Sequence, residues 1–334
     1  MLLRQSVDVA VGMCAGVSSM YTTPKLFRLP AIPGCAPTKS NDMLLFPAME
    51  IGQRPHHVIY FPGDVQNYRD VMAAHSENFR WMRWSFEDVA ALLSKRFTTY
   101  NIWIVKSSRM HLHKFSCYDN FVESNMFGAP THSGEVVAFK QLFSLLVNAF
   151  PVAQNILRSQ NNKYVNRGYN LSVYDKSGCP VETKCGTCQE ASAIHFGLPS
   201  VKDSLSLTLV GFSKGCVVLN QLLHELEQAK KDKDISSFIA NIEAMYWLDG
   251  GHSGGSETWI THPDILKVFA ETGIDVHTHV TPYQVSDSMR SWIGQEQKKF
   301  VQILKENSVM VDNRLHFMYE MPSLDNHFRV HEVF

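Results

Sequence analysis

The segment around Ser213 constrains the fold more than any other part of the sequence. A short apolar strand is expected at residues 206–210 and an amphipathic helix at residues 214–231, and the turn between them reads Gly211-Phe212-Ser213-Lys214-Gly215. A G-x-S-x-G sequence between a strand and a helix is typical of a nucleophile elbow, where the turn exposes the serine hydroxyl and glycines stand where side chains would clash. Ser213 is therefore the candidate nucleophile. A glycine-tolerant tight turn without a chemical role is the alternative.

The rest of the chain predicts alternating strands and helices, because short apolar runs alternate with segments of helical periodicity. The expected strands are 57–61, 101–106, 206–210, 244–248, 274–280 and 314–319, and the expected helices are 84–97, 135–150, 214–231, 262–272 and 291–305. This alternation favours a mostly parallel sheet of about six strands with helices on both faces. Together with the elbow, it predicts an α/β fold of the α/β-hydrolase type.

Two segments fall outside this alternation. Residues 1–50 are expected to form an N-terminal tail, and residues 51–334 a single α/β-hydrolase domain. Within that domain, residues 153–200 are rich in Asn, Ser, Gly, Lys and Thr and predict a flexible polar insertion. The first 40 residues carry Arg4, Lys25 and Arg28 against one acid, Asp8, which is compatible with a mitochondrial transit peptide. A cytoplasmic protein with an untargeted tail is the alternative.

Composition excludes several classes of function. The net charge of −1 provides no basic surplus for a phosphate backbone, so we expect no nucleic-acid partner. No apolar run approaches the roughly 20 residues that span a bilayer, so no transmembrane segment is expected. The seven cysteines are irregularly spaced and do not indicate a disulfide framework.

The partners of the nucleophile are sought in the chain order serine, acid, histidine. Asp287 lies in the loop after the penultimate expected strand, where this fold commonly carries its acid; Asp249, directly after the preceding strand, is the rival. His327 lies in the segment behind the last expected strand and is the candidate general base; His331 is the alternative, and His316 lies inside the expected strand.

An oxyanion hole needs two backbone donors. One is expected to be the amide of Lys214, directly after the nucleophile, and the other the amide of Asp64 or Val65 in the turn behind the first expected strand. The side chain of Lys214 would favour an anionic substrate or lower the pKa of the serine if it faced the site, but would do neither if it pointed to solvent.

Three weaker signals remain. Ser253, in Gly251-His252-Ser253-Gly254-Gly255, is a second G-x-S-x-G match, but no helix opens directly behind it. Cys185 and Cys188 have C-x-x-C spacing, with Cys179 and His195 nearby, which is too few paired ligands to predict a zinc site.

The segment Met110-His111-Leu112-His113 indicates a loop near the mouth of the site, with Tyr118 and Asp119 as candidate substrate contacts. No G-x-G-x-x-G or P-loop pattern is present, so no nucleotide cofactor is expected. No metal is expected either, because His111 and His113 have no evident acidic partner and the cysteines have no second pair.

Six segments carry a resemblance to a known family: residues 56–68, 110–121, 211–223, 246–255, 277–285 and 326–334. They closely resemble a vertebrate mitochondrial family first catalogued as an open reading frame on human chromosome two. The resemblance covers about residues 55–334 except the insertion. It implies a serine esterase or lipase by motif, a mitochondrial location, a link to respiration, and glycogen branching enzyme as a partner.

The sequence therefore predicts a serine hydrolase that cleaves a carboxylic ester or thioester, lipid-derived ones included, through Ser213, His327 and Asp287. The alternative is a non-catalytic scaffold of the same fold that binds a protein partner or a lipid.

Overall fold

The computed structural model describes residues 26–48, 56–167 and 205–334. The strands are β1 (Phe27–Pro33), β2 (Ser40–Phe46), β3 (His56–Phe61), β4 (Tyr100–Val105), β5 (Arg109–His111), β6 (Phe115–Cys117), β7 (Glu123–Ser124), β8 (Pro130–Thr131), β9 (Ser206–Phe212), β10 (Ile242–Leu248), β11 (Asp275–Val280) and β12 (Val311–Leu315). The helices are α1 (Arg69–Ala73), η1 (Phe79–Trp84), α2 (Phe86–Arg96), α3 (Ala138–Arg167), η2 (Ser213–Gly215), α4 (Cys216–Ala229), α5 (Lys233–Ile239), α6 (Pro263–Ala270), α7 (Pro282–Val285), η3 (Ser288–Arg290), α8 (Ser291–Glu306) and α9 (Leu324–Val333).

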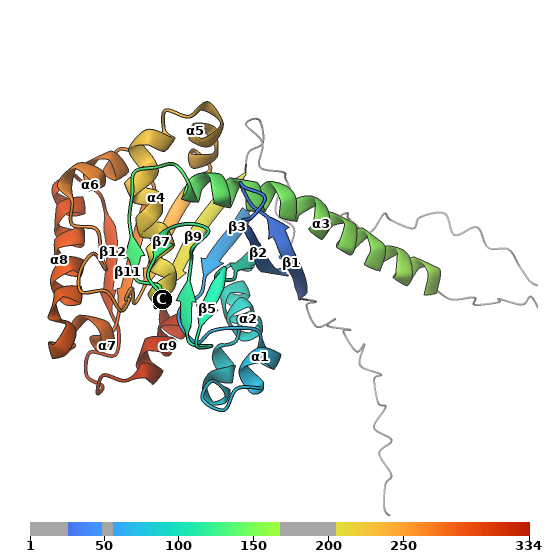
Figure 1. Ribbon diagram of the computed structural model, residues 1–334, viewed down its shortest axis with the longest axis horizontal. Coiled ribbons are helices and arrows are strands. Elements are labelled where there is room, and N and C mark those ends of the chain that lie inside the picture. The colour runs from blue at the N-terminus through green and yellow to red at the C-terminus, as the bar shows by residue number, and fades with distance from the viewer. Residues whose placement is uncertain (1–25, 49–55, 168–204) are drawn as a thin grey trace, which may run out of the picture.

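Eight strands form one twisted sheet in the order β1-β2-β4-β3-β9-β10-β11-β12 (Figure 1). Strands β4, β3, β9, β10, β11 and β12 run parallel to one another, as predicted. Strand β2 is antiparallel to both β1 and β4. Strand β9 is buried along its whole length because it lies near the middle of the sheet. The predicted α/β-hydrolase fold is confirmed.

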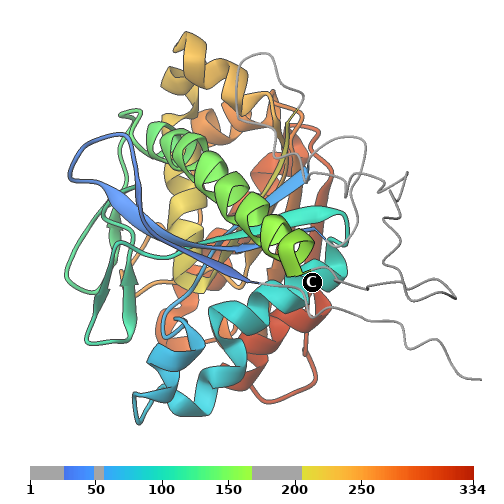
Figure 2. The ribbon, with the colours of Figure 1, turned by 90° about the vertical axis from the view of Figure 1, so that its right-hand side faces the viewer.

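Helices cover both faces of the sheet, and each face has its own apolar core (Figure 2). Helices α3, α4, α5, α6 and α8 pack on one face, and α1, η1, α2 and α9 pack on the other. Since both faces are covered, the central strands are continuous apolar runs, which is why the sequence revealed them.

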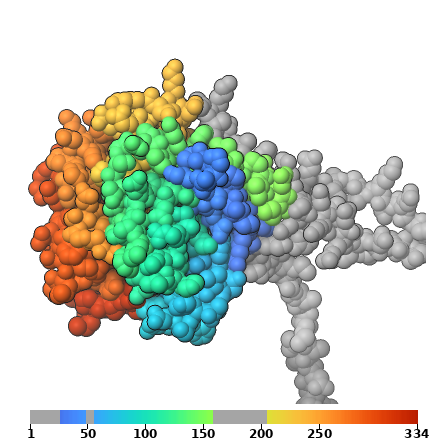
Figure 3. All heavy atoms as spheres, viewed as in Figure 1, coloured from blue at the N-terminus to red at the C-terminus, as the bar shows by residue number. Residues whose placement is uncertain are grey.

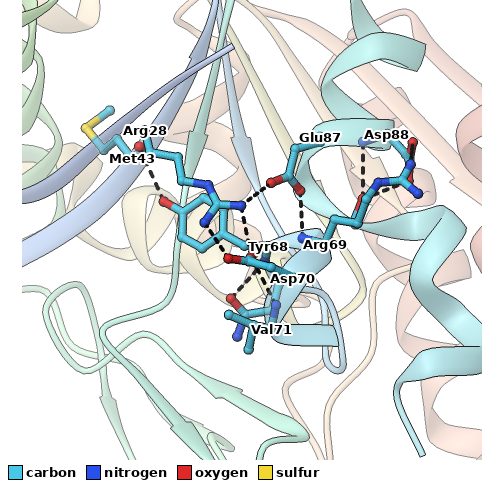
Figure 4. Close-up of polar contacts among 10 residues, drawn as sticks. Arg28, Met43, Tyr68, Arg69, Asp70, Val71, Glu87 and Asp88 are labelled. Carbon is cyan, nitrogen blue, oxygen red and sulfur yellow. Dashed lines mark hydrogen bonds and ion pairs between the residues drawn. The ribbon is translucent and has the colours of Figure 1, made fainter. Parts of the chain in front are cut away.

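The prediction that residues 1–50 form a tail is wrong for residues 27–46, because β1 and β2 lie there and extend the sheet. Arg28 in β1 forms a bidentate ion pair with Asp70 of α1, at 2.9 and 3.0 Å, and a third bond to Glu87 of α2 at 2.7 Å (Figure 4). Its guanidinium also lies over the ring of Tyr68, 4.1 Å from the centroid. These contacts attach the edge strand to the helices of one face. Residues 1–25, which hold the first part of the predicted transit peptide, lie outside the described residues.

Two further boundaries differ from the prediction. Helix α3 continues to Arg167, so the first part of the predicted insertion is helical, while residues 168–200 lie outside the described residues. The last strand ends at Leu315 instead of continuing to residue 319, because Phe317 has a φ of +55°, which an extended strand does not accommodate. Among the described residues, no helix is both long enough and apolar enough to cross a bilayer.

The segment from β5 to β8 lies outside the main sheet. It forms two small hairpins, β5 with β6 and β7 with β8. In the space-filling view this segment (green) covers the middle of the face towards the viewer, between β1 and β2 (blue) and the C-terminal half (orange) (Figure 3). The hairpins thus provide one wall for a site above the sheet.

Buried neutral histidines make the fold sensitive to acid, and His57 in β3 is the test case. Burial lowers the pKa of His57 to about 3 from an ordinary value of 6.5, and its Nδ1 accepts a hydrogen bond from Trp103 at 3.0 Å. Because only the unfolded chain binds this proton between pH 6.5 and 3, stability is lost as pH falls through that window. For one such group the loss is about 2 kcal/mol between pH 7.5 and pH 5.

We expect the variant His57→Gln, which keeps an acceptor but does not titrate, to lose about 2 kcal/mol less than the wild type over the same interval. Urea unfolding at the two pH values measures this difference. Equal losses in both proteins would show that His57 is not responsible.

Candidate active site

Ser213 lies at a sharp turn between β9 and α4, in a backbone conformation that residues other than glycine rarely adopt. Its φ is +50°, in the left-handed region, and strain of this kind is concentrated at functional sites. The two glycines of the motif are required by close packing. A Cβ on Gly215 would lie 1.9 Å from the carbonyl oxygen of Phe61, and one on Gly211 would lie 2.9 Å from the Cα of Cys216. The segment therefore has the geometry of a nucleophile elbow.

His327 and Asp249 form a buried hydrogen-bonded pair beside the elbow. The Nδ1 of His327, on α9, lies 2.6 Å from Oδ2 of Asp249, directly behind β10, and both side chains are almost inaccessible to solvent. Asp249 also accepts bonds from the backbone amide of Thr281 at 2.7 Å and from its hydroxyl at 2.6 Å. Its φ is +46°. The carboxylate is thus fixed on both oxygens, and its orientation requires His327 to carry its proton on Nδ1.

Asp287, the acid preferred on sequence grounds, does not contact His327. Its carboxylate accepts from the amide of Met289 at 2.8 Å and pairs with Arg290 at 2.8 Å. The hydrogen bond from Arg290 lowers the pKa of this carboxyl. The preference for Asp287 is therefore wrong in geometric terms, and the rival Asp249 holds the position next to the histidine. Helix α7, inserted between β11 and Asp287, carries Asp287 away from the end of the strand.

Ser213 and His327 line the same pocket, of about 260 Å³. No hydrogen bond joins them directly among the described residues, and such bonds are commonly long before a substrate binds. The pocket is lined by Asp64, Val65, Lys114, Phe115, Ser213, Gly251, His252, Ser253, Tyr283, Gln284, Arg290, Leu324, His327 and Phe328. A larger hollow of about 510 Å³ is lined by residues of α8 and by Asn313 of β12, does not include Ser213, and contains neither histidine nor serine in its lining.

The predicted oxyanion donors are only partly brought into place. The amide of Val65 donates to the carbonyl of Lys114 at 2.7 Å, so it is not available to an oxyanion. The amides of Lys214 and Asp64 have no intramolecular acceptor in the described part of the chain, and both lie next to pocket-lining residues. The structure therefore leaves Lys214 and Asp64 as the candidate donors and removes Val65.

The side chain of Lys214 points neither to solvent nor into the pocket. It is fully buried; its Nζ donates to the carbonyl of Phe127 at 2.7 Å and lies 3.8 Å from Oδ2 of Asp64. Burial lowers the pKa of Lys214 and raises the pKa of Asp64, while their mutual attraction opposes both shifts. The carboxylate of Asp64 also accepts from the amide of Ser116. This pair attaches the elbow to the β5–β8 segment.

The other candidates from the sequence have different environments. His331 is buried between the hydroxyl of Tyr60, at 2.8 Å, and the carbonyl of Phe328, at 2.6 Å, and burial lowers its pKa to about 3, so it is not available as a base. His316 lies against His279 instead of the elbow. Ser253 lies on the rim of the pocket in a loop that no helix follows directly.

The predicted loop at residues 110–113 forms the end of β5 and the turn behind it, and neither it nor the substrate contacts predicted nearby line the pocket. Tyr118 is buried and donates to the carbonyl of Pro62 at 2.6 Å, and Asp119 pairs with Arg109 at 2.8 Å. Lys114 and Phe115, at the tip of the β5–β6 hairpin, line the pocket instead. Cys179, Cys185, Cys188 and His195 lie outside the described residues.

Comparison with known proteins identifies the family. A family model described as C2orf69 matches residues 28–310. "Mitochondrial protein C2orf69" of Homo sapiens is 53% identical over 348 residues, covering 97% of this chain and 90% of its own length.

The chain belongs to the C2orf69 family. The C2orf69 homologue of Danio rerio is 41% identical, with 92% of this chain and 85% of the relative covered, and is also named a mitochondrial protein. These relatives confirm the resemblance seen in the sequence and the predicted mitochondrial location.

Solved structures similar to this member of the C2orf69 family include two esterases. A hyperthermophilic esterase from the archeon Pyrobaculum calidifontis is 10% identical with a TM-score of 0.39, covering 92% of this chain and 83% of its own. A lipase/esterase from Lactobacillus plantarum is 12% identical with a TM-score of 0.39, covering 91% and 96%. Identities and TM-scores this low establish no shared activity, and the fold class follows from the sheet and the elbow.

Proposed function

We propose that the protein is a serine hydrolase that cleaves a carboxylic ester or thioester, with Ser213 as nucleophile, His327 as base and Asp249 as the orienting acid. The observation that carries the proposal is the 2.6 Å hydrogen bond between His327 and Asp249. His327 lines the same pocket as Ser213, whose φ is +50°. A serine and a histidine in the lining of one pocket, with the histidine held by a buried carboxylate, suit acyl transfer.

In the proposed reaction, Oγ of Ser213 attacks the carbonyl carbon while Nε2 of His327 takes its proton. Asp249 stabilises the imidazolium through Nδ1 and stays ionised. The amides of Lys214 and Asp64 would donate to the oxyanion. His327 then gives the proton to the leaving alkoxide or thiolate, and a water molecule, deprotonated by the same histidine, releases the acid from the acyl-serine.

The pocket supports a small apolar acyl group. Phe115, Tyr283, Leu324 and Phe328 provide apolar wall, and about 260 Å³ is below the range of about 300–1,000 Å³ that holds a drug-sized ligand. A lipid-derived substrate would thus place only the acyl segment next to the ester in this pocket.

Labelling with a fluorescent fluorophosphonate tests the proposal. The wild type is expected to label covalently, Ser213→Ala to lose all labelling, and His327→Ala to lose most of it because the serine is no longer deprotonated. Ser253→Ala, which removes the serine on the rim, is the matched control and is expected to label normally. A folded wild type that does not label would refute the hydrolase.

A scaffold that binds a protein partner is the second candidate, and glycogen branching enzyme is the partner that the family resemblance implies. This role would be supported if the wild type fails to label and both it and Ser213→Ala bind purified branching enzyme equally well.

A further inference from the structure

A cluster of metal-ligand side chains lies at the edge of the sheet, apart from the pocket. His277 and His279 are two residues apart on β11 and therefore face the same side of the sheet, and Asp312 on β12 is the direct partner of His277 in the register. One nitrogen from each histidine and one oxygen of Asp312 lie within 4.8 Å of one another. The cluster exists only because two strands are paired in this register.

Each side chain of the cluster has a ligand atom available. His279 is fully buried; its Nδ1 lies 2.9 Å from Nε2 of His316, while its Nε2 has no hydrogen-bond partner in the described chain. A buried ring nitrogen without a partner is costly unless something binds it. Oδ1 of Asp312 accepts a hydrogen bond from Nε of Arg314 at 2.8 Å. Oδ2 of Asp312 faces His277 and lies 3.4 Å from its Nδ1.

The histidine rings are held in place by their neighbours. The rings are supported from one side, with His277 stacked on Tyr246 at 4.0 Å between centroids and His279 packed against Phe334 at 5.8 Å.

We propose that His277, His279 and Asp312 bind one zinc ion. Two imidazoles and a carboxylate form a nitrogen and oxygen ligand set that suits zinc, with water in the fourth tetrahedral position. Ligand atoms around tetrahedral zinc are about 3.3 Å apart, so the side chains need to close by only an ångström or so from their present separation. His316 acts as the outer partner that orients His279.

The ion would join the edge strand β12 to β11 next to the acid of the active site. The carbonyl of His279 accepts a hydrogen bond from the backbone amide of Asp249 at 2.7 Å. A metal that fixes His279 would therefore also fix the turn that carries Asp249. Zinc is therefore expected to stabilise the folded protein and to act on this turn without touching a substrate.

The test is zinc binding by the untagged full chain, stripped with a chelator and titrated by calorimetry. Thiolates also bind zinc, so all proteins carry Cys179→Ser, Cys185→Ser and Cys188→Ser. We expect one ion per chain at micromolar affinity or tighter, and a rise in Tm on binding. Asp312→Asn, which keeps the shape of the side chain, and His279→Ala are expected to weaken binding at least about tenfold and to lose the rise in Tm.

His262→Ala is the matched control, because His262 is an exposed histidine that also lies near an acid, Glu257, at 3.5 Å. It is expected to bind zinc like the parent. Cobalt in place of zinc should give the visible absorption of a tetrahedral nitrogen and oxygen site in the parent and not in Asp312→Asn. If the parent does not bind, or if Asp312→Asn and His279→Ala bind as the parent does, the site is disproved, whatever the labelling of Ser213 shows.

Discussion

Replacing Asp249 by Asn is expected to lower kcat/KM on a short p-nitrophenyl ester about 10⁴-fold, the loss typical when the acid of a Ser-His-Asp triad becomes an amide. The reason is the tautomer of His327. Thr281 donates its amide to one oxygen of Asp249, so the side chain of Asn would keep its carbonyl there and turn its NH₂ towards His327. The ring would then carry its proton on Nε2, facing Ser213, and could not accept another.

Asp287→Asn is the control, because Asp287 was the acid favoured by the sequence. Within the described part of the chain its carboxylate bonds with Met289 and Arg290 at a partly exposed position, so the rate is expected to change by no more than a few-fold. Steady-state kinetics on both variants decides between the two carboxylates. A large loss in Asp287→Asn with little change in Asp249→Asn would reverse the assignment.

Gly215→Ala is expected to destabilise the protein by about 3 kcal/mol or more, equivalent to a fall in Tm of roughly 4 °C or more for a chain of 334 residues. The backbone of Gly215 is ordinary, with φ −60° and ψ −23°, so conformational strain is not the cause. The cause is contact, since the added Cβ would lie 1.9 Å from the carbonyl oxygen of Phe61 and 2.9 Å from that of Pro62. Helix α4 must move away from β3, and the amide of Lys214 moves with it, so hydrolysis should fall as well.

Gly255→Ala is the matched substitution for this experiment. A Cβ there meets no atom within 4 Å, and its stability should stay within about 0.5 kcal/mol of the wild type. Thermal unfolding followed by circular dichroism measures both variants. If Gly215→Ala unfolds at the wild-type temperature, the close approach of the elbow to β3 is not present in solution.

The sequence predicted the parts of the fold that are buried on both sides. Strands β3, β4, β9 and β10 contain short apolar runs, and such runs are visible without knowledge of their neighbours. Strands β1 and β2 were missed because they lie at one edge. The burial of β1 alternates, it contains two prolines, and β2 opens with three polar residues, so both resemble loop.

The elbow and the histidine were predicted from the sequence, but the acid was not. Chain order places both Asp249 and Asp287 between Ser213 and His327 and cannot separate them. The sheet distinguishes the two carboxylates, because β10 directly neighbours β9 and Asp249, the residue after β10, therefore lies next to the elbow. Val65 failed as an oxyanion donor for a similar reason, since its amide pairs with Lys114, about 50 residues away, through a hairpin that local patterns did not reveal.

The cluster on β11 and β12 shows the same limit. His277 and His279 looked like ordinary strand residues, and Asp312 is more than 30 residues further on, so only the register between the two strands reveals that they are neighbours.

The place of His327 in the chain has a consequence for synthesis. Helix α9 follows all eight strands of the main sheet, so a ribosome completes the whole sheet, with Ser213 and Asp249 in it, before it adds the histidine. Nascent chains would thus remain without the proposed general base until translation has passed residue 327. A nonsense codon between residues 316 and 326 would yield a polypeptide with every strand and the nucleophile, but with the hydrophobic surface under α9 uncovered and no residue to activate the serine.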